Sequence, residues 1–128
     1  DLERLGDHAK DILEFSMKLK NPSKENTRIK ELVNYVINMV KDAVKSYIDK
    51  DEKLAREVIL RDDHVDEEYA AMLVTLTKAG DEKEIDTRFL VYTSLVVKYI
   101  ERIADHATNI AEWVIYILTG YYKDKQII

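Results

Sequence analysis

Apolar side chains recur at intervals of three and four residues along most of this chain, which is the spacing of one face of an α-helix. The pattern is clearest between residues 25 and 48, where it comprises Ile29, Leu32, Val33, Val36, Ile37, Val40, Val44, Tyr47 and Ile48. No stretch alternates between apolar and polar residues with a period of two, so we predict no β-strand. Only three glycines and one proline interrupt the 128 residues. The sequence therefore predicts a small number of long amphipathic helices.

The few helix-breaking residues divide this pattern into four predicted helices. We expect these helices over residues 1–20, 25–48, 51–80 and 81–120. Pro22 ends the first helix, because proline disfavours helical geometry at the residue before it. Asp51 is a candidate N-cap of the third helix, Gly80 and Gly120 are candidate C-terminal caps, and the run 81–84 has capping-box spacing. Short connections favour antiparallel neighbours, so the expected fold is an all-α, antiparallel bundle of four helices.

Composition excludes several classes of function. The formal net charge is −5, which makes the chain a poor binder of phosphate backbones, so we expect no nucleic-acid partner. No apolar run reaches about eighteen residues, so no membrane span is predicted. The chain contains no cysteine, which excludes disulfides and thiolate sites and is compatible with a reducing cytoplasm. No phosphate-binding glycine loop, Ser/His/Asp set or Glu-x-x-His motif is present, so we predict no catalytic residues.

The chain begins inside an apolar rhythm formed by Leu2, Leu5, Ala9 and Ile12. Neither an initiator methionine nor a helix start signal precedes that rhythm. We therefore expect this chain to be a fragment of a longer protein.

A thirteen-residue segment near the start of the chain recurs near its end. Residues 2–14 (LERLGDHAKDILE) and residues 100–112 (IERIADHATNIAE) are identical at seven of thirteen positions, at a constant offset of 98 residues. The identical positions include charged residues as well as apolar ones, which a requirement for core packing alone does not explain. The repeated feature is a pair of carboxylates one helical turn apart, which is Glu3 with Asp7 and then Glu101 with Asp105.

The third predicted helix carries another acidic pair with the same spacing. Asp62 and Asp66 fall in the middle of the apolar stripe of that helix, where uncompensated carboxylates cost several kcal/mol. A multivalent cation converts the repulsion within such pairs into attraction. Helices that lie side by side can thus offer four carboxylates to two or more metal ions. Oxygen ligands favour hard cations such as magnesium, manganese or ferric iron, and zinc is also compatible.

Two less specific interpretations stand beside the metal hypothesis. A single acidic pair on a helix most often belongs to a solvated surface, and nearby cations can neutralise it. The candidate neutralising residues are Arg4, Arg61, Lys98 and Arg102. His8 and His106 diverge by roughly 100° from the acids that precede them, so we expect them as polar residues at the boundaries between packed helices rather than on a shared metal. Trp113 is expected to pack rather than bind a ligand.

Three segments resemble the PhoU family of phosphate-signalling regulators. They are the run Tyr99–Trp113 (YIERIADHATNIAEW), the acidic run Arg61–Tyr69 (RDDHVDEEY) and the run Asp1–Ala9 (DLERLGDHA). The resemblance implies two tandem three-helix bundles in the whole protein. Residues 1–20 would then be the last helix of the first repeat, and residues 21–128 the whole second repeat. It also implies a multinuclear metal cluster of iron or zinc, with magnesium or manganese as alternatives. Its ligands would be Asp62, Asp66, Glu101 and Asp105, while Glu3 and Asp7 would form half of a second site.

The resemblance implies a regulatory rather than catalytic function. We expect a cytoplasmic, metal-binding negative regulator of phosphate uptake and of the phosphate-starvation response. Its expected partners are the ATPase subunit of the phosphate ABC transporter and a sensor histidine kinase. A homo-oligomer, for example a homodimer, is expected because Leu90, Val91 and Val97 suggest more burial than one bundle needs. The alternatives are a regulatory domain of a sodium–phosphate cotransporter, a metal-dependent phosphohydrolase, and a structural bundle with salt-bridged acids.

Overall fold

The computed structural model describes residues 24–83, 85, 87–122 and 125–126, and all statements about structure concern these residues. They form three helices, α2 (Lys24–Asp49), α3 (Glu52–Asp81) and α4 (Thr87–Thr119), followed by β1 (Tyr121–Tyr122) and β2 (Lys125–Gln126). The three helices confirm the predicted helical fold for this part of the chain. The helix predicted over residues 1–20 lies outside the described residues. None of the described helices is long and apolar enough to cross a membrane.

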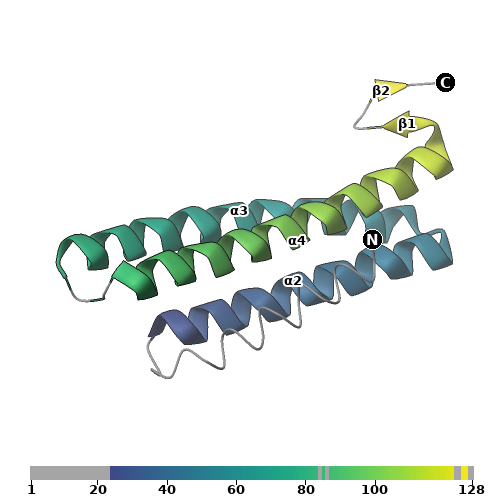
Figure 1. The fold of residues 1–128 in the computed structure, drawn as a ribbon. Helices are drawn as coiled ribbons and strands as arrows, with labels where there is room; N and C mark the ends of the chain where they lie inside the picture. The colour runs from purple at the N-terminus through teal and green to yellow at the C-terminus, as the bar shows by residue number, and fades with distance from the viewer. Residues whose placement is uncertain (1–23, 84, 86, 123–124, 127–128) are drawn as a thin grey trace.

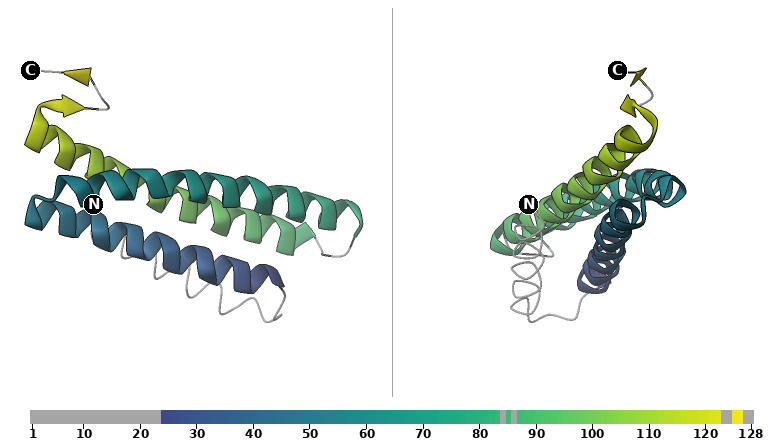
Figure 2. Two further views of the ribbon diagram at one scale, coloured as in Figure 1. Left: turned by 180° about the vertical axis from the view of Figure 1, so that it is seen from behind. Right: turned by 90° about the vertical axis from the view of Figure 1, so that its right-hand side faces the viewer.

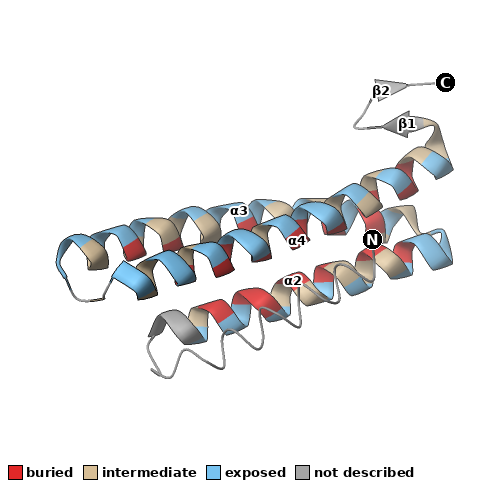
Figure 3. Cartoon of the chain, viewed as in Figure 1, coloured by how far each residue is buried: buried red, intermediate tan, exposed pale blue. Residues whose placement is uncertain are grey.

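The three helices lie side by side, and each of them contacts the other two (Figures 1 and 2). The chain turns back on itself at both connections, so α3 runs between the end of α2 and the start of α4. Figure 3 shows that the buried residues face the space between the helices. The residues buried in this core are Ile29, Leu32, Val33, Val36, Met39, Ala43, Ala55, Val58, Val65, Met72, Val96, Val97, Ile100, Ile103, Ala104, Ala107, Ala111, Val114 and Ile115. Small side chains on α4 allow its close approach to the other helices.

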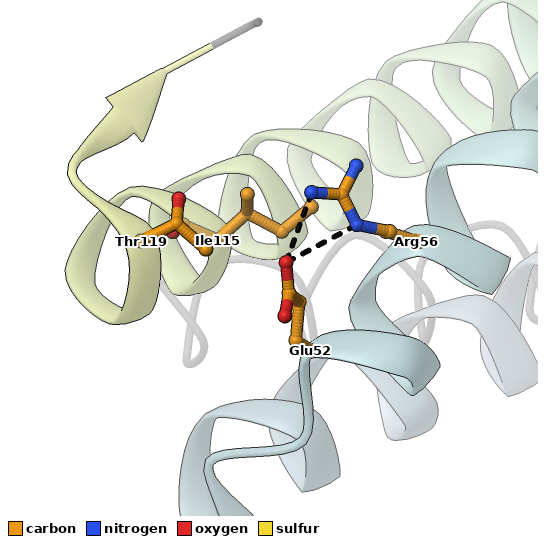
Figure 4. A network of polar contacts seen from close by, with 4 residues as sticks. All are labelled: Glu52, Arg56, Ile115 and Thr119. Atoms are coloured by element: carbon orange, nitrogen blue, oxygen red, sulfur yellow. Dashed lines mark hydrogen bonds and ion pairs between the residues drawn. The ribbon is translucent and has the colours of Figure 1, made fainter. Parts of the chain in front are cut away.

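The turn between α2 and α3 follows the local signals in the sequence. Asp51 accepts a hydrogen bond from the backbone N–H of Leu54 at 3.0 Å, which confirms it as the N-cap of α3. Glu52 lies in the first turn, where a negative charge is favourable to the helix dipole. Figure 4 shows the ion pair of Glu52 with Arg56, four residues further along α3, at 2.9 Å. In the same view, at the end of α4, Thr119 donates to the carbonyl of Ile115 at 2.6 Å.

The turn between α3 and α4 differs from the prediction. α3 continues through Gly80 to Asp81, so the run 81–84 does not begin α4, which starts at Thr87. Lys83, with a φ of 57°, takes the left-handed position that Gly80 was predicted to fill. Gly80 instead makes room for α4, because a Cβ at this position would lie 2.9 Å from Cδ2 of Leu90.

The other end of α4 matches the prediction, and the tail after it does not. α4 ends at Thr119, and Gly120 has a φ of 77°, as expected of a glycine just past a helix. A minimal antiparallel ladder then pairs Tyr121 with Gln126 and Tyr122 with Lys125, although the sequence pattern predicted no strand. Two-residue strands are too short to show alternation, so hydrophobic periodicity could not have predicted them.

Candidate metal centre

The structure brings two of the predicted acidic pairs together. Asp62 and Asp66 lie on α3, and Glu101 and Asp105 lie on α4, which packs against α3. Asp66, Asp105 and Glu101 are all close enough to Asp62 for their negative charges to raise its pKa. The other pair, Glu3 with Asp7, lies outside the described residues, so its placement stays a prediction. Four carboxylates from two helices therefore form one acidic cluster, which we define as Asp62, Asp66, Glu101 and Asp105.

Asp62 is the most perturbed member of the acidic cluster. Burial is the largest cause that raises its pKa from 3.8 to about 6, and the charges of Asp66, Asp105, Asp63 and Glu101 follow. The Oδ1 atom of Asp62 is buried and has no hydrogen-bond partner among the described residues. A buried oxygen without a donor is costly, and charge on it is costlier still. The structure thus places an uncompensated carboxylate in the apolar stripe of α3.

The pKa of Asp105 is also raised above its ordinary value. Burial is the largest cause, followed by the negative charge of Glu101 and by a hydrogen-bonding contribution from the same side chain. The negative charges of Glu101 and Asp66 thus both act on this carboxyl group.

One of the candidate neutralising residues contacts the acidic cluster. Lys98 donates from Nζ to Oε2 of Glu101 at 2.8 Å, and its Nζ lies 5.4 Å from the ring centroid of Tyr69 on α3. Arg61 is directed elsewhere, because its Nη1 pairs with Oδ2 of Asp42 on α2 at 2.6 Å. Arg102 is exposed and makes no ion pair with these acids in the described part of the chain. Arg4 lies outside the described residues.

The donors suit a hard cation, although they do not form a finished coordination shell. Within residues 24–83, 85, 87–122 and 125–126, no three Asp, Glu or His side chains are arranged to hold a metal ion. The oxygen-only donors, the orphaned Oδ1 of Asp62 and the excess of negative charge nevertheless fit a multivalent cation. Binding would require carboxylate side chains of the cluster to reorient toward the ion.

Two other predictions concern ring-bearing residues near these helices. His106 is exposed and is not a member of the acidic cluster. Trp113 is 57% exposed and stacks on Tyr116 with ring centroids 5.1 Å apart, so it packs against a neighbour on the surface of α4 rather than in the core.

Sequence reasoning missed a groove between α2 and α3. The groove has a volume of about 400 Å³, and Nε of Arg28 pairs with Oε2 of Glu68 at 3.3 Å on its wall. Its lining residues are Arg28, Glu31, Leu32, Tyr35, His64 and Glu68. The wall residues come from two helices, and no local spacing could have shown that they meet.

The packed helices and their paired acids define a class of small helical domains with an acidic surface cluster. The chain matches the PhoU domain over residues 29–114. It therefore belongs to the PhoU family, as the resemblance implied.

The relatives are accessory proteins of phosphate-specific transport systems. The PhoU homologue of Clostridium acetobutylicum is 39% identical over 127 residues, which is 97% of this chain and 58% of the relative. The homologue of Synechocystis is 36% identical over 122 residues, covering 94% of this chain and 54% of the relative. Homologue 1 of Thermotoga maritima is 32% identical over 123 residues, covering 94% and 53%. The chain thus spans about half the length of the curated relatives it matches. No solved structure gives a significant match.

Proposed function

We propose that this chain is the metal-binding part of a regulatory adaptor that represses phosphate uptake and the phosphate-starvation response when phosphate is plentiful. The names of its relatives, which describe accessory proteins of phosphate-specific transport, support the phosphate-related role. The observation that carries the metal-binding part is Oδ1 of Asp62, buried without a donor among three further carboxylates. Such an arrangement is stable at neutral pH only when cations or protons compensate it.

The proposed ligand is a multinuclear cluster of iron or zinc, with magnesium or manganese as alternatives. Four carboxylates supply up to eight oxygens. This number is enough to bind two ions, with some carboxylates bridging them. Hard cations favour such donors. Asp62, Asp66, Glu101 and Asp105 would hold the cluster in this chain. Glu3 and Asp7 would contribute to a second site of the longer protein.

The proposed partners are the ATPase subunit of a phosphate ABC transporter, a sensor histidine kinase and a second copy of the protein, all in the cytoplasm. We propose an adaptor rather than an enzyme. A phosphohydrolase would need several cationic side chains beside the metals to hold the substrate phosphate, whereas, of the cationic residues that the structure describes, Arg61 is paired with Asp42 and Lys98 alone contacts the cluster. A regulatory domain of a sodium–phosphate cotransporter would use the same site, and the sequence of the full-length protein distinguishes that variant.

Elemental analysis tests the metal site directly. The wild-type chain, purified without chelator and dialysed against zinc or ferric iron, is compared with the double variant Asp66→Asn/Asp105→Asn. We expect the wild type to retain metal and the double variant to lose most of it. The matched control is Glu57→Gln, which removes an exposed carboxylate from α3 outside the cluster. Equal metal content in the wild type and the double variant would exclude this site.

A further inference from the structure

We propose that Lys98 is a built-in counter-ion of the acidic cluster, which an incoming metal ion must displace. This inference rests on the proposed function and assigns a regulatory element to the same site. Lys98 would therefore set the affinity of the cluster for metal without being a ligand.

The contacts of Lys98 place its ammonium group where a cation is needed. Its Nζ lies 2.8 Å from Oε2 of Glu101, three residues along α4, and 5.4 Å from the ring centroid of Tyr69 on α3. The ammonium group thus approaches both helices that carry the cluster. A cation within about 6 Å of an aromatic face is attracted to it, which helps to hold Lys98 over the site.

The two partners of this ion pair differ in their freedom to move. The Glu101 side chain is 16% exposed, whereas the Lys98 side chain is 46% exposed. A lysine carries its charge on a flexible four-carbon stem and is readily solvated once released. Lys98 can therefore swing into water while Glu101 stays in place, which is the behaviour expected of a displaceable counter-ion.

Lys98 alone does not neutralise the negative charge of the acidic cluster. When all four acids are ionised, one lysine leaves an excess of three negative charges in the cluster. Lys98 reaches Glu101, but Oδ1 of Asp62 still has no donor among the described residues. A monovalent group that pairs with one carboxylate of α4 does not bridge the acids of both helices, whereas a multivalent ion can.

The Lys98 ammonium group and a metal ion compete for the same carboxylate, Glu101. The Oε2 atom of Glu101 cannot face both an ammonium group at 2.8 Å and a metal ion at coordination distance. Metal binding must break the ion pair and must also overcome the repulsion between two cations. A partly exposed ion pair accounts for a factor of roughly two to five in affinity, and loss of the repulsion adds to it. Lys98→Met should therefore tighten binding of a divalent ion by about threefold to tenfold.

Calorimetric titration of the chelator-treated chain with Zn²⁺ or Mn²⁺ tests this inference. Lys98→Met is compared with the wild type, with Lys98→Arg, and with the matched control Arg102→Met. Arg102 is an exposed cation four residues further along α4, so its removal changes the net charge equally without touching Glu101. We expect a lower Kd for Lys98→Met, a Kd close to wild type for Lys98→Arg, and at most a twofold change for Arg102→Met. Lys98→Gln gives a second neutral variant, and helical circular dichroism verifies folding of each.

A spectroscopic readout separates displacement from a general charge effect. The lysines are ¹³C-dimethylated, and the Lys98 signal is assigned by its absence in Lys98→Met. Addition of Zn²⁺ should move the Lys98 signal toward the position of solvated lysines and leave the exposed Lys41 and Lys45 of α2 unchanged.

The outcomes distinguish this inference from the proposed function. A wild-type chain that binds neither ion overturns the metal site and the role of Lys98 with it. A wild-type chain that binds metal, while Lys98→Met binds no more tightly than Arg102→Met, leaves the site intact and overturns the counter-ion role. An unmoved Lys98 signal at saturating Zn²⁺ would do the same.

Discussion

Replacement of Asp62 by asparagine should stabilise the metal-free protein at neutral pH. The pKa of Asp62 is about 6 in the folded chain against an ordinary value of 3.8, because burial and the neighbouring carboxylates disfavour its charge. The difference corresponds, at about 1.36 kcal/mol for each pKa unit, to an upper limit of about 3 kcal/mol. Solvent screens this partly exposed group, so we expect a gain of about 1 to 2 kcal/mol for Asp62→Asn at pH 7.

The pH dependence of this gain follows from proton linkage. Between pH 3.8 and about 6 the folded chain retains a proton on Asp62 that the unfolded chain has lost. The stability of the metal-free wild type therefore decreases as the pH rises through this interval. Above the interval the full penalty is present, and below pH 3.8 it disappears. The advantage of Asp62→Asn should accordingly be largest at pH 7, shrink toward pH 4 and vanish below it.

Urea unfolding followed by circular dichroism, in EDTA at pH 7 and pH 4, measures these differences. Glu57→Gln is the control, because it removes an exposed carboxylate from the same helix. Saturation with Zn²⁺ should reverse the ranking, since the wild type then gains binding energy that the variant lacks. An Asp62→Asn chain that is less stable than the wild type at pH 7, or equally stabilised at both pH values, would refute the reasoning.

Substitutions at three further positions test the packing and capping of the helices by the same unfolding measurement. Thr93 is 1% exposed and its Oγ1 has no partner among the described residues, so Thr93→Val should be neutral or stabilise by up to ~1 kcal/mol; a clear loss would reveal a hidden donor or acceptor. Asp51→Ala should cost about 1 kcal/mol through loss of the N-cap bond to Leu54, while Asp51→Asn should cost little. Gly80→Leu should destabilise by about 1 to 3 kcal/mol because even a Cβ meets Leu90, and Gly80→Ala should be tolerated better, since the Leu90 side chain can shift; equal losses would contradict this account.

Local chemistry made several features of the fold predictable. Asp51 caps α3 because its side chain reaches an N–H only three residues away, and Gly120 follows α4 because glycine adopts a positive φ at little cost. The candidate metal ligands were predicted from spacing, since acids four residues apart share a helical face. Asp62 stood out because the surrounding positions of its helix are apolar, and the structure confirms that burial perturbs it.

The sequence by itself determined the three described helices, one N-cap and the spacing of the acidic pairs, because each depends on residues within one or two helical turns. The tertiary structure alone decided which partners those residues meet. Arg61 and Lys98 were equal candidates to neutralise the acids, yet packing directs Arg61 to Asp42 on α2 and leaves Lys98 beside Glu101. Gly80 was predicted to end a helix, and the approach of Leu90 gave it another use. Contacts between distant residues depend on how whole helices pack, and that geometry is set by the complete core rather than by any local pattern.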